Sequence, residues 1–174
     1  LFPVEERAVP ASTIAGEEAS PTQPFTAVVA PLSPHRFTAA DAWGVTAEDR
    51  EACRATMQGL RAEGVFTPPS LEGTLVVPSN IGGAHWGGVA VDPQRHVAVV
   101  PVNRIAAMVQ LIPADGFDRA AARGEAERWD YEYTRMEGTP YVMRRRLLLS
   151  PGGLPCTPPP WGAGSRTSTS TSRT

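Results

Sequence analysis

Proline and glycine interrupt this chain so frequently that long helices are largely excluded. Its 174 residues include 18 prolines and 16 glycines. Together they make up about a fifth of the chain, where average usage gives roughly an eighth. Proline removes a backbone donor and glycine loses much conformational entropy, so both destabilise helix interiors. The composition argues against a helix bundle, while 41% hydrophobic residues argue against wholesale disorder.

The charge balance excludes two classes of partner. All 16 basic residues are arginines, the acidic residues number 18, and the formal net charge is -2. No global basic field therefore exists that would hold nucleic acid or an anionic membrane surface. No apolar run reaches the roughly 18 residues that a membrane span needs, so no transmembrane segment is predicted. The chain starts at Leu1 without a signal peptide, and we expect a piece of a longer protein.

Two segments precede the predicted strands. Residues 1–34 contain prolines at short intervals, so we expect an extended, irregular segment lying on a neighbour's surface. One helix is predicted over about residues 47–62, with Thr46 as its N-cap, Asp49 at the capping-box position and Gly64 as its stop. An apolar stripe at helical spacing is formed by Cys53, Met57 and Leu60.

Short β-branched runs bounded by Gly, Pro and Asp follow the helix. They lie at 73–78, 88–92, 96–101 and 108–113, and they predict strands. The turn at 92–95 has proline in its second position and favours a hairpin between the second and third runs. We therefore predict a β-meander over about residues 73–113, as in a sandwich, a barrel or a propeller blade. We expect residues 114–137 to form a charged segment outside the sheet that contains a short helix.

The C-terminal end differs in composition from the rest. We expect one domain over residues 1–161 and a disordered Ser/Thr-rich tail over 162–174. Shifting a Ser-Thr repeat of TCG and ACC codons by one base gives Leu-Asp codons. We therefore hypothesise a frameshift near residue 162, which an uninterrupted frame in verified DNA would disprove.

The densest motif for ligand binding is PSNIGGAHWGG at residues 78–88. Its four glycines flank His85 and Trp86, and they would let a flat ligand approach the indole ring and the adjacent backbone. A glycine-bounded strand entry with a core tryptophan explains the motif equally simply and is the more common case. The three histidines have no metal-ligand spacing, and no GxSxG or GxGxxG motif occurs. Arg144–Arg146 reads as a solvated edge.

The two cysteines leave two interpretations open. Cys53 and Cys156 could form one long-loop disulfide in an oxidising compartment. They could equally be two independent buried thiols, and the sequence does not favour either alternative.

Several irregular motifs, taken in order, resemble one enzyme family. They are residues 19–25 (ASPTQPF), 41–44 (DAWG), 64–70 (GVFTPPS), 73–75 (GTL), 80–93 (NIGGAHWGGVAVDP), 111–113 (LIP), 138–141 (GTPY) and 149–156 (LSPGGLPC). Together they are similar to the membrane-bound quinoprotein glucose dehydrogenases, which oxidise sugars or polyols with pyrroloquinoline quinone (PQQ). The resemblance covers residues 1 to about 162.

The resemblance implies a mainly β chain, namely part of an eight-bladed β-propeller on the periplasmic face of the bacterial inner membrane. It also implies PQQ, a calcium or magnesium ion, and electron transfer to ubiquinone. The family's catalytic Asp and a cofactor-contacting Lys lie upstream of the matched region, so no catalytic or metal-ligating residue is assigned here. The implied cofactor contacts are Trp86, His85 (where relatives often have Asn) and Asn103, because Pro101 stands where relatives have an Asn contact.

These implications lead to one expected function and two alternatives. We expect a fragment that lacks several propeller blades and is inactive by itself, because the catalytic base lies outside it and its blade edges are unpaired. The departures at His85 and Pro101 motivate a non-catalytic β-rich interaction module instead. The remaining alternative is a pseudogene product.

Overall fold

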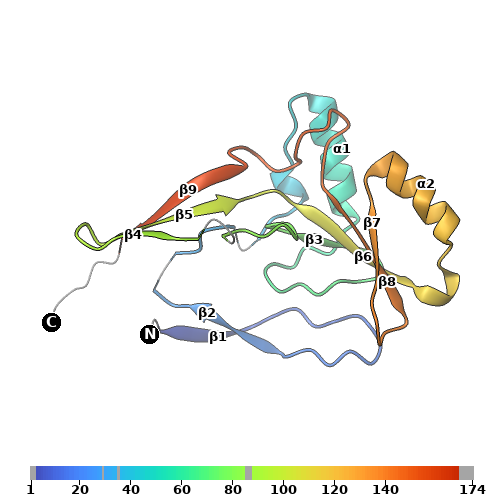
Figure 1. Ribbon diagram of the computed structural model, residues 1–174, viewed down its shortest axis with the longest axis horizontal. Coiled ribbons are helices and arrows are strands. Elements are labelled where there is room, and N and C mark those ends of the chain that lie inside the picture. Colours follow the sequence, from blue (N-terminus) through green and yellow to red (C-terminus); the bar gives the residue numbers. More distant parts are fainter. Residues whose placement is uncertain (1–2, 29, 35, 85–87, 169–174) are drawn as a thin grey trace.

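The computed structural model describes residues 3–28, 30–34, 36–84 and 88–168 (Figure 1). Its strands are β1 (Val4–Ala8), β2 (Thr22–Thr26), β3 (Thr74–Val76), β4 (Ala90–Asp92), β5 (Val97–Asn103), β6 (Ala107–Pro113), β7 (Glu132–Arg135), β8 (Tyr141–Leu147) and β9 (Gly162–Ser168). Its helices are α1 (Ala47–Gln58) and α2 (Arg119–Trp129), with single 3-10 turns at Ala39–Asp41 and Ala114–Gly116. The prediction of a mainly β chain with a helix near 47–62 is confirmed.

The largest sheet holds four antiparallel strands in the order β3-β6-β8-β7. Strand β6 lies inside this sheet and is paired with β8 from Ala107 opposite Leu147 to Pro113 opposite Tyr141. Its residues Ala107, Met108 and Val109 are all buried. Because successive strand residues point to opposite faces, both faces of β6 are covered in this region.

A second sheet has the order β4-β5-β9. The predicted hairpin at 92–95 is confirmed, because β4 pairs antiparallel with β5. The Asp92 carboxylate accepts hydrogen bonds from the backbone amides of Gln94 and Arg95, each at 3.0 Å. The Arg95 amide is the main reason that the pKa of Asp92 lies below its ordinary value.

The predicted single meander over 73–113 is wrong. The first run (β3) pairs with the fourth (β6), while the two middle runs form the other sheet with β9. The chain changes sheet at residues 104–106, where the Arg104 amide donates to the Trp161 carbonyl and the Ser79 amide donates to the Ile105 carbonyl. These contacts join segments far apart in sequence, which strand spacing alone does not report.

Both ends of the chain contain strands that the sequence did not predict. Strands β1 and β2 form an exposed antiparallel pair in which Pro24 lies opposite Glu6. Proline is tolerated there because the pair has only edge strands. Residues 162–168, expected to be disordered, form β9 along β5. Strand β5 pairs with β4 along one edge, and residues 162–168 extend along its other edge. Residues 169–174 lie outside the described residues.

Helix α1 starts as predicted and ends earlier. The Thr46 hydroxyl accepts the Asp49 amide proton at 3.0 Å, which is the expected N-cap bond. The helix ends at Gln58 with Gly59 as C-cap, not at Gly64. The reason is that Arg61 already bridges to β3: its amide donates to the Gly73 carbonyl and its carbonyl accepts from the Leu75 amide, both at 2.9 Å.

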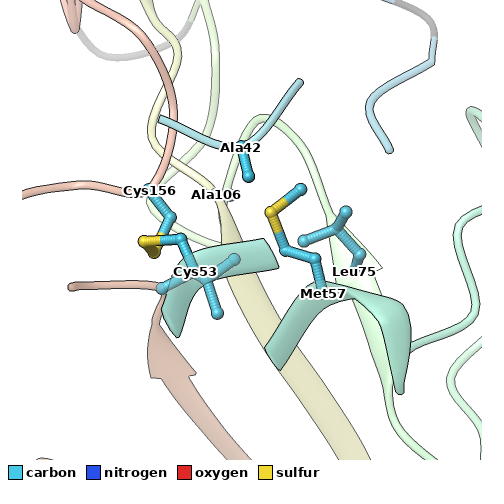
Figure 2. Close-up of a cluster of buried hydrophobic side chains, with 7 residues drawn as sticks. Ala42, Cys53, Met57, Leu75, Ala106 and Cys156 are labelled. Atoms are coloured by element: carbon cyan, nitrogen blue, oxygen red, sulfur yellow. A yellow bond between two sulfur atoms is a disulfide. The ribbon is translucent and has the colours of Figure 1, made fainter. Parts of the chain in front are cut away.

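The core lies between α1 and the chain segments that flank the four-stranded sheet (Figure 2). Its buried members are Ala42, Cys53, Met57, Leu75, Ala106, Leu148 and Cys156. The predicted stripe of α1 therefore faces the core, with Leu60 partly buried at its margin. This cluster fixes α1 against the start of β6 and the end of β8.

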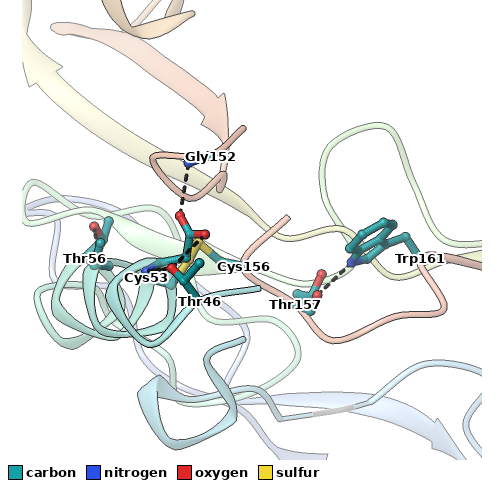
Figure 3. Close-up of a disulfide and its surroundings, with 9 residues drawn as sticks. Thr46, Cys53, Thr56, Gly152, Cys156, Thr157 and Trp161 are labelled. Atoms are coloured by element: carbon teal, nitrogen blue, oxygen red, sulfur yellow. Dashed lines mark hydrogen bonds between the residues drawn. A yellow bond between two sulfur atoms is a disulfide. The ribbon is translucent and has the colours of Figure 1, made fainter. Parts of the chain in front are cut away.

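Cys53 and Cys156 form a disulfide, which decides between the two alternatives left open by the sequence. The link joins α1 to the loop after β8, and its Cα atoms lie 5.5 Å apart. A second contact joins the same two segments, since the Gly152 amide donates to the Asp49 carboxylate at 3.1 Å (Figure 3). This bond is the main reason that the pKa of Asp49 lies below its ordinary value.

Candidate functional site

The candidate site is built where the end of β5 meets the glycine-rich motif of residues 78–88. The Asn103 amide donates to the Gly83 carbonyl at 3.2 Å. The Ser79 amide donates to the Ile105 carbonyl at 2.7 Å, just beyond the strand end. Two elements that the sequence named separately as cofactor contacts are therefore neighbours.

The Asn103 side chain is half-buried, and its amide oxygen is hydrogen-bonded. Its Oδ1 accepts a hydrogen bond from the Ile105 amide at 2.7 Å, so the amide oxygen holds the loop that leads to β6. Its Nδ2 carries the donor capacity of the side chain. Asn103 follows Pro101 by two positions in the same strand, and it therefore lies on the same face of β5, about 7 Å further along.

The other two predicted contacts, His85 and Trp86, lie outside the described residues. On either side of them, Gly82 has a φ of 85° and Gly88 a φ of 65°. These left-handed conformations favour glycine, so the motif needs glycine at both positions. A Cβ at Gly83 would lie 2.8 Å from a ring carbon of Pro78, which shows how closely the turn packs on itself.

A small cavity of about 90 Å³ lies behind this junction. Arg104 and Thr157 line it together with apolar residues, which are Pro34, Phe37, Val77, Pro158 and Pro159. The buried Nε of Arg104 and Oγ1 of Thr157 have no hydrogen-bond partner within the described part of the chain. Sequence reasoning missed both residues, and no motif marks either of them.

The edge of the site is held by the C-terminal segment. The Trp161 carbonyl accepts from the Arg104 amide at 2.8 Å. Its indole Nε1 donates to the Thr157 carbonyl at 2.7 Å (Figure 3). The ring packs edge-on against Trp43, with centroids 5.6 Å apart. Residues 157–161 thus connect the site to the segment that precedes α1.

The described residues do not by themselves fit a metal ion or a PQQ molecule. Among them, no group of three or more His, Cys, Asp or Glu could hold a metal. His96 is exposed in the hairpin turn, and His35 lies outside the described residues. The one assigned side chain that is described, Asn103, uses its oxygen within its own loop. We therefore derive no reaction step from this part of the chain.

A family model of known proteins matches residues 1–174 throughout, namely the PQQ-type glucose/ethanol/alcohol dehydrogenase β-propeller domain. The chain belongs to this family. Its membership confirms the resemblance seen in the motifs and explains the mainly β fold. Propeller blades are typically four-stranded antiparallel sheets, and β3-β6-β8-β7 has that number and pairing.

Curated relatives support the same family. The chain is 37% identical over 163 residues to a probable quinate dehydrogenase (quinone) of Xanthomonas campestris pv. juglandis. It is 37% identical over 170 residues to the quinoprotein glucose dehydrogenase of Escherichia coli and 39% identical over 168 residues to quinoprotein glucose dehydrogenase A of Acinetobacter calcoaceticus. Each match covers 93% of this chain and 20–21% of the relative. The chain therefore spans about a fifth of the length of these relatives.

No solved structure matches the chain. In the part of the chain that the structure describes, no helix is long and apolar enough to cross a membrane.

Proposed function

We propose that this chain forms part of the β-propeller of a longer PQQ-dependent dehydrogenase that oxidises glucose, a related sugar or polyol, or quinate. The observation that carries the proposal is the family match over residues 1–174. Relatives with closely similar identities are named for glucose and for quinate, which supports a polyhydroxylated substrate. The chain matches only about a fifth of the length of each relative, which supports the proposal that it needs further blades for activity.

The proposal extends to the cofactor and the electron acceptor. PQQ, together with a calcium or magnesium ion, would supply the redox chemistry for substrate oxidation, and Trp86, His85 and Asn103 would contribute to holding it. Ubiquinone takes the electrons onward, and the enzyme acts at the periplasmic face of the inner membrane. The disulfide supports an oxidising compartment, because buried structural disulfides persist in the periplasm and are rare in the cytosol.

Within this chain we assign the cofactor contacts to Trp86, His85 and Asn103. Trp86 would offer its ring to the flat cofactor, and His85 would add a polar edge beside it. The hydrogen bond between Asn103 and Gly83 supports this grouping, because it holds the strand end against the motif that carries both residues. Asn103 would donate a hydrogen bond to the cofactor through Nδ2. Pro101, on the same face of β5, has no amide proton to donate.

A cofactor titration tests the assignment. Residues 1–174 replace the matched segment of the E. coli quinoprotein glucose dehydrogenase, and PQQ binding is followed by tryptophan fluorescence. Trp86→Phe and Asn103→Ala should each weaken PQQ binding about tenfold, which corresponds to about 1.4 kcal/mol. Trp43→Phe is the matched control, since Trp43 packs against Trp161 and is assigned no cofactor contact. Equal PQQ affinity in all variants would contradict the assignment.

The expected inactivity of the 174-residue chain needs its own experiment. Purified chain is mixed with PQQ, calcium, glucose or quinate, and a dye acceptor. No turnover above the blank is expected, because the resemblance implies that the family's catalytic Asp and cofactor-contacting Lys lie upstream of the matched region. Turnover that depends on PQQ would contradict the proposal that further blades are required.

A further inference from the structure

A second cavity, of about 420 Å³, lies between α2 and β7, away from the candidate site. Figure 1 shows α2 beside β7 at the end of the molecule opposite the β4-β5-β9 sheet. The described lining residues are Phe117, Arg119, Ala122, Arg123, Tyr131, Tyr133, Arg135 and Val142. Its volume falls within the range of small-molecule sites, about 300–1,000 Å³. The proposed dehydrogenase function makes no use of it.

The lining residues combine positive charge with aromatic walls. Arg119 and Arg123 come from α2 and Arg135 from β7, and no described lining residue is acidic. None of these three arginines forms an ion pair with a described residue. The three side chains are exposed and line one cavity, so each can offer a positive charge and hydrogen-bond donors to an anion bound there. The cavity is therefore electrostatically suited to an anionic ligand.

Aromatic rings fix the shape of the cavity. Phe117 and Tyr133 have ring centroids 5.5 Å apart, and Tyr133 and Tyr131 have centroids 6.2 Å apart. The guanidinium groups of Arg144 and Arg146 lie 4.8 and 5.0 Å from the centroid of the Tyr131 ring. These cation–π contacts hold the ring and add positive potential.

This arrangement corrects the prediction that Arg144–Arg146 is a solvated edge. All three arginines are half-buried in β8. Arg144 also donates from Nε to Oε1 of Gln110 at 2.7 Å. Arg144 and Arg146 therefore hold the Tyr131 ring that lines the cavity, whereas Arg145 pairs with Glu132.

The floor of the cavity is apolar. Ala122 and Val142 are 7% and 5% exposed, so they present buried carbon surface beneath the rings. An inorganic anion would leave this surface unfilled, whereas a flat ring would cover it. The forked guanidinium group matches a carboxylate with two parallel hydrogen bonds. We propose that this cavity is a binding site for a small aromatic carboxylate.

Ligand-observed NMR titration with benzene-1,3-dicarboxylate tests the proposal, and it uses the E. coli quinoprotein glucose dehydrogenase that carries residues 1–174 in place of its own matched segment. Saturable binding is expected, and benzene-1,3-dimethanol, the uncharged analogue, should bind at least about tenfold more weakly. The double substitution Arg123→Gln with Arg135→Gln should weaken dicarboxylate binding by about tenfold or more. Both side chains are exposed, so these changes leave the core intact. Arg50→Gln is the matched control, an exposed arginine on α1 that should leave binding unchanged.

Four outcomes would overturn the proposal. They are no saturable binding by the unsubstituted protein, equal binding of the uncharged analogue, equal losses in the Arg50→Gln control and the double variant, or equal competition by inorganic phosphate. Phosphatidylglycerol vesicles serve as a further arm. Binding to the vesicles without binding to the free dicarboxylate would identify a lipid surface instead. This test does not involve PQQ or Trp86, so its failure leaves the proposed function untouched.

Discussion

Reduction of the Cys53–Cys156 disulfide is the perturbation whose effect follows most directly from the structure. The two cysteines are 103 positions apart in sequence, and each is only 1% exposed. Closing a loop of about 100 residues restricts the unfolded chain by an entropy worth about 4.7 kcal/mol at 25 °C. Both sulfur atoms remain in the core after reduction, so the packed volume hardly changes. We therefore expect reduction to lower the free energy of unfolding by about 3–5 kcal/mol.

Urea unfolding of the same chain with and without a thiol reductant measures this loss. With a slope of about 2 kcal/mol per molar urea, the midpoint should fall by roughly 2 M. Thiol titration of the urea-unfolded protein provides the control. It should detect thiols only after reduction, since the structure pairs both cysteines. A double Cys53→Ala, Cys156→Ala variant should no longer respond to the reductant.

Two results would refute this reasoning. The first is free thiol in the unreduced, unfolded chain, which would show that the pair is not formed. The second is a confirmed disulfide whose reduction moves the midpoint by less than about 0.5 M, equivalent to about 1 kcal/mol. In that case α1 and the loop after β8 would stay associated in the unfolded chain, and the loop-closure estimate would fail.

Three further substitutions test the packing around α1. Asp49→Asn should make the free energy of unfolding depend less on pH in acid. The pKa of Asp49 is lowered in the folded state, so its carboxylate stabilises the fold above the unfolded-state pKa, and this stability is lost as pH falls through the folded-state pKa. Thermal unfolding at a series of acidic pH values measures the effect. Met57→Ala should cost about 2–5 kcal/mol in urea unfolding, since Met57 is 2% exposed. Gly73→Ala should cost about 1–3 kcal/mol in the same assay, because φ is 100° and the new Cβ would lie 2.8 Å from Cδ2 of Leu60. Gly124→Ala, with open space for its Cβ in α2, is the matched control and should not destabilise. Unchanged acid stability in Asp49→Asn, or unfolding midpoints equal to the parent chain for the other two, would contradict these assignments.

Local structure was predictable where neighbouring residues decide it. The Thr46 cap and the hairpin turn at Asp92 follow from contacts within a few residues, and the helical spacing of Cys53 and Met57 indicated which face of α1 is buried. The end of α1 was not predictable, because the bridge from Arg61 to β3 ends the helix before Gly64. Caps and turns depend on hydrogen bonds between neighbouring residues, whereas the end of α1 depends on backbone hydrogen bonds to a strand that is distant in sequence.

Strand pairing was the main failure of sequence reasoning. The succession of four short runs between 73 and 113 suggested one meander, yet β3 pairs with β6 across the whole inserted β4–β5 hairpin. The second partner of β5, besides β4, is β9, about 60 residues later. Periodicity identifies a strand and its faces, but it carries no information about which edge is free.

The cofactor contacts named from the sequence stay a prediction, and no sequence pattern indicated the geometry around Asn103. Asn103 was named on resemblance, and its bond to the Gly83 carbonyl involves only backbone atoms. Backbone contacts of this kind leave no signature in residue types. The cavity beside α2 is similar in this respect: Tyr131 and Tyr133 are close in sequence, but the arginines around them come from α2, β7 and β8.

The measurement that tests the account most directly is dye-linked sugar oxidation by the E. coli quinoprotein glucose dehydrogenase carrying residues 1–174 in place of its own matched segment. A chain that belongs to this propeller and holds part of its cofactor should give PQQ-dependent turnover of glucose or quinate. That turnover should fall when Trp86 or Asn103 is replaced and persist in Trp43→Phe. A folded chimera that binds no PQQ and oxidises neither substrate would contradict the account.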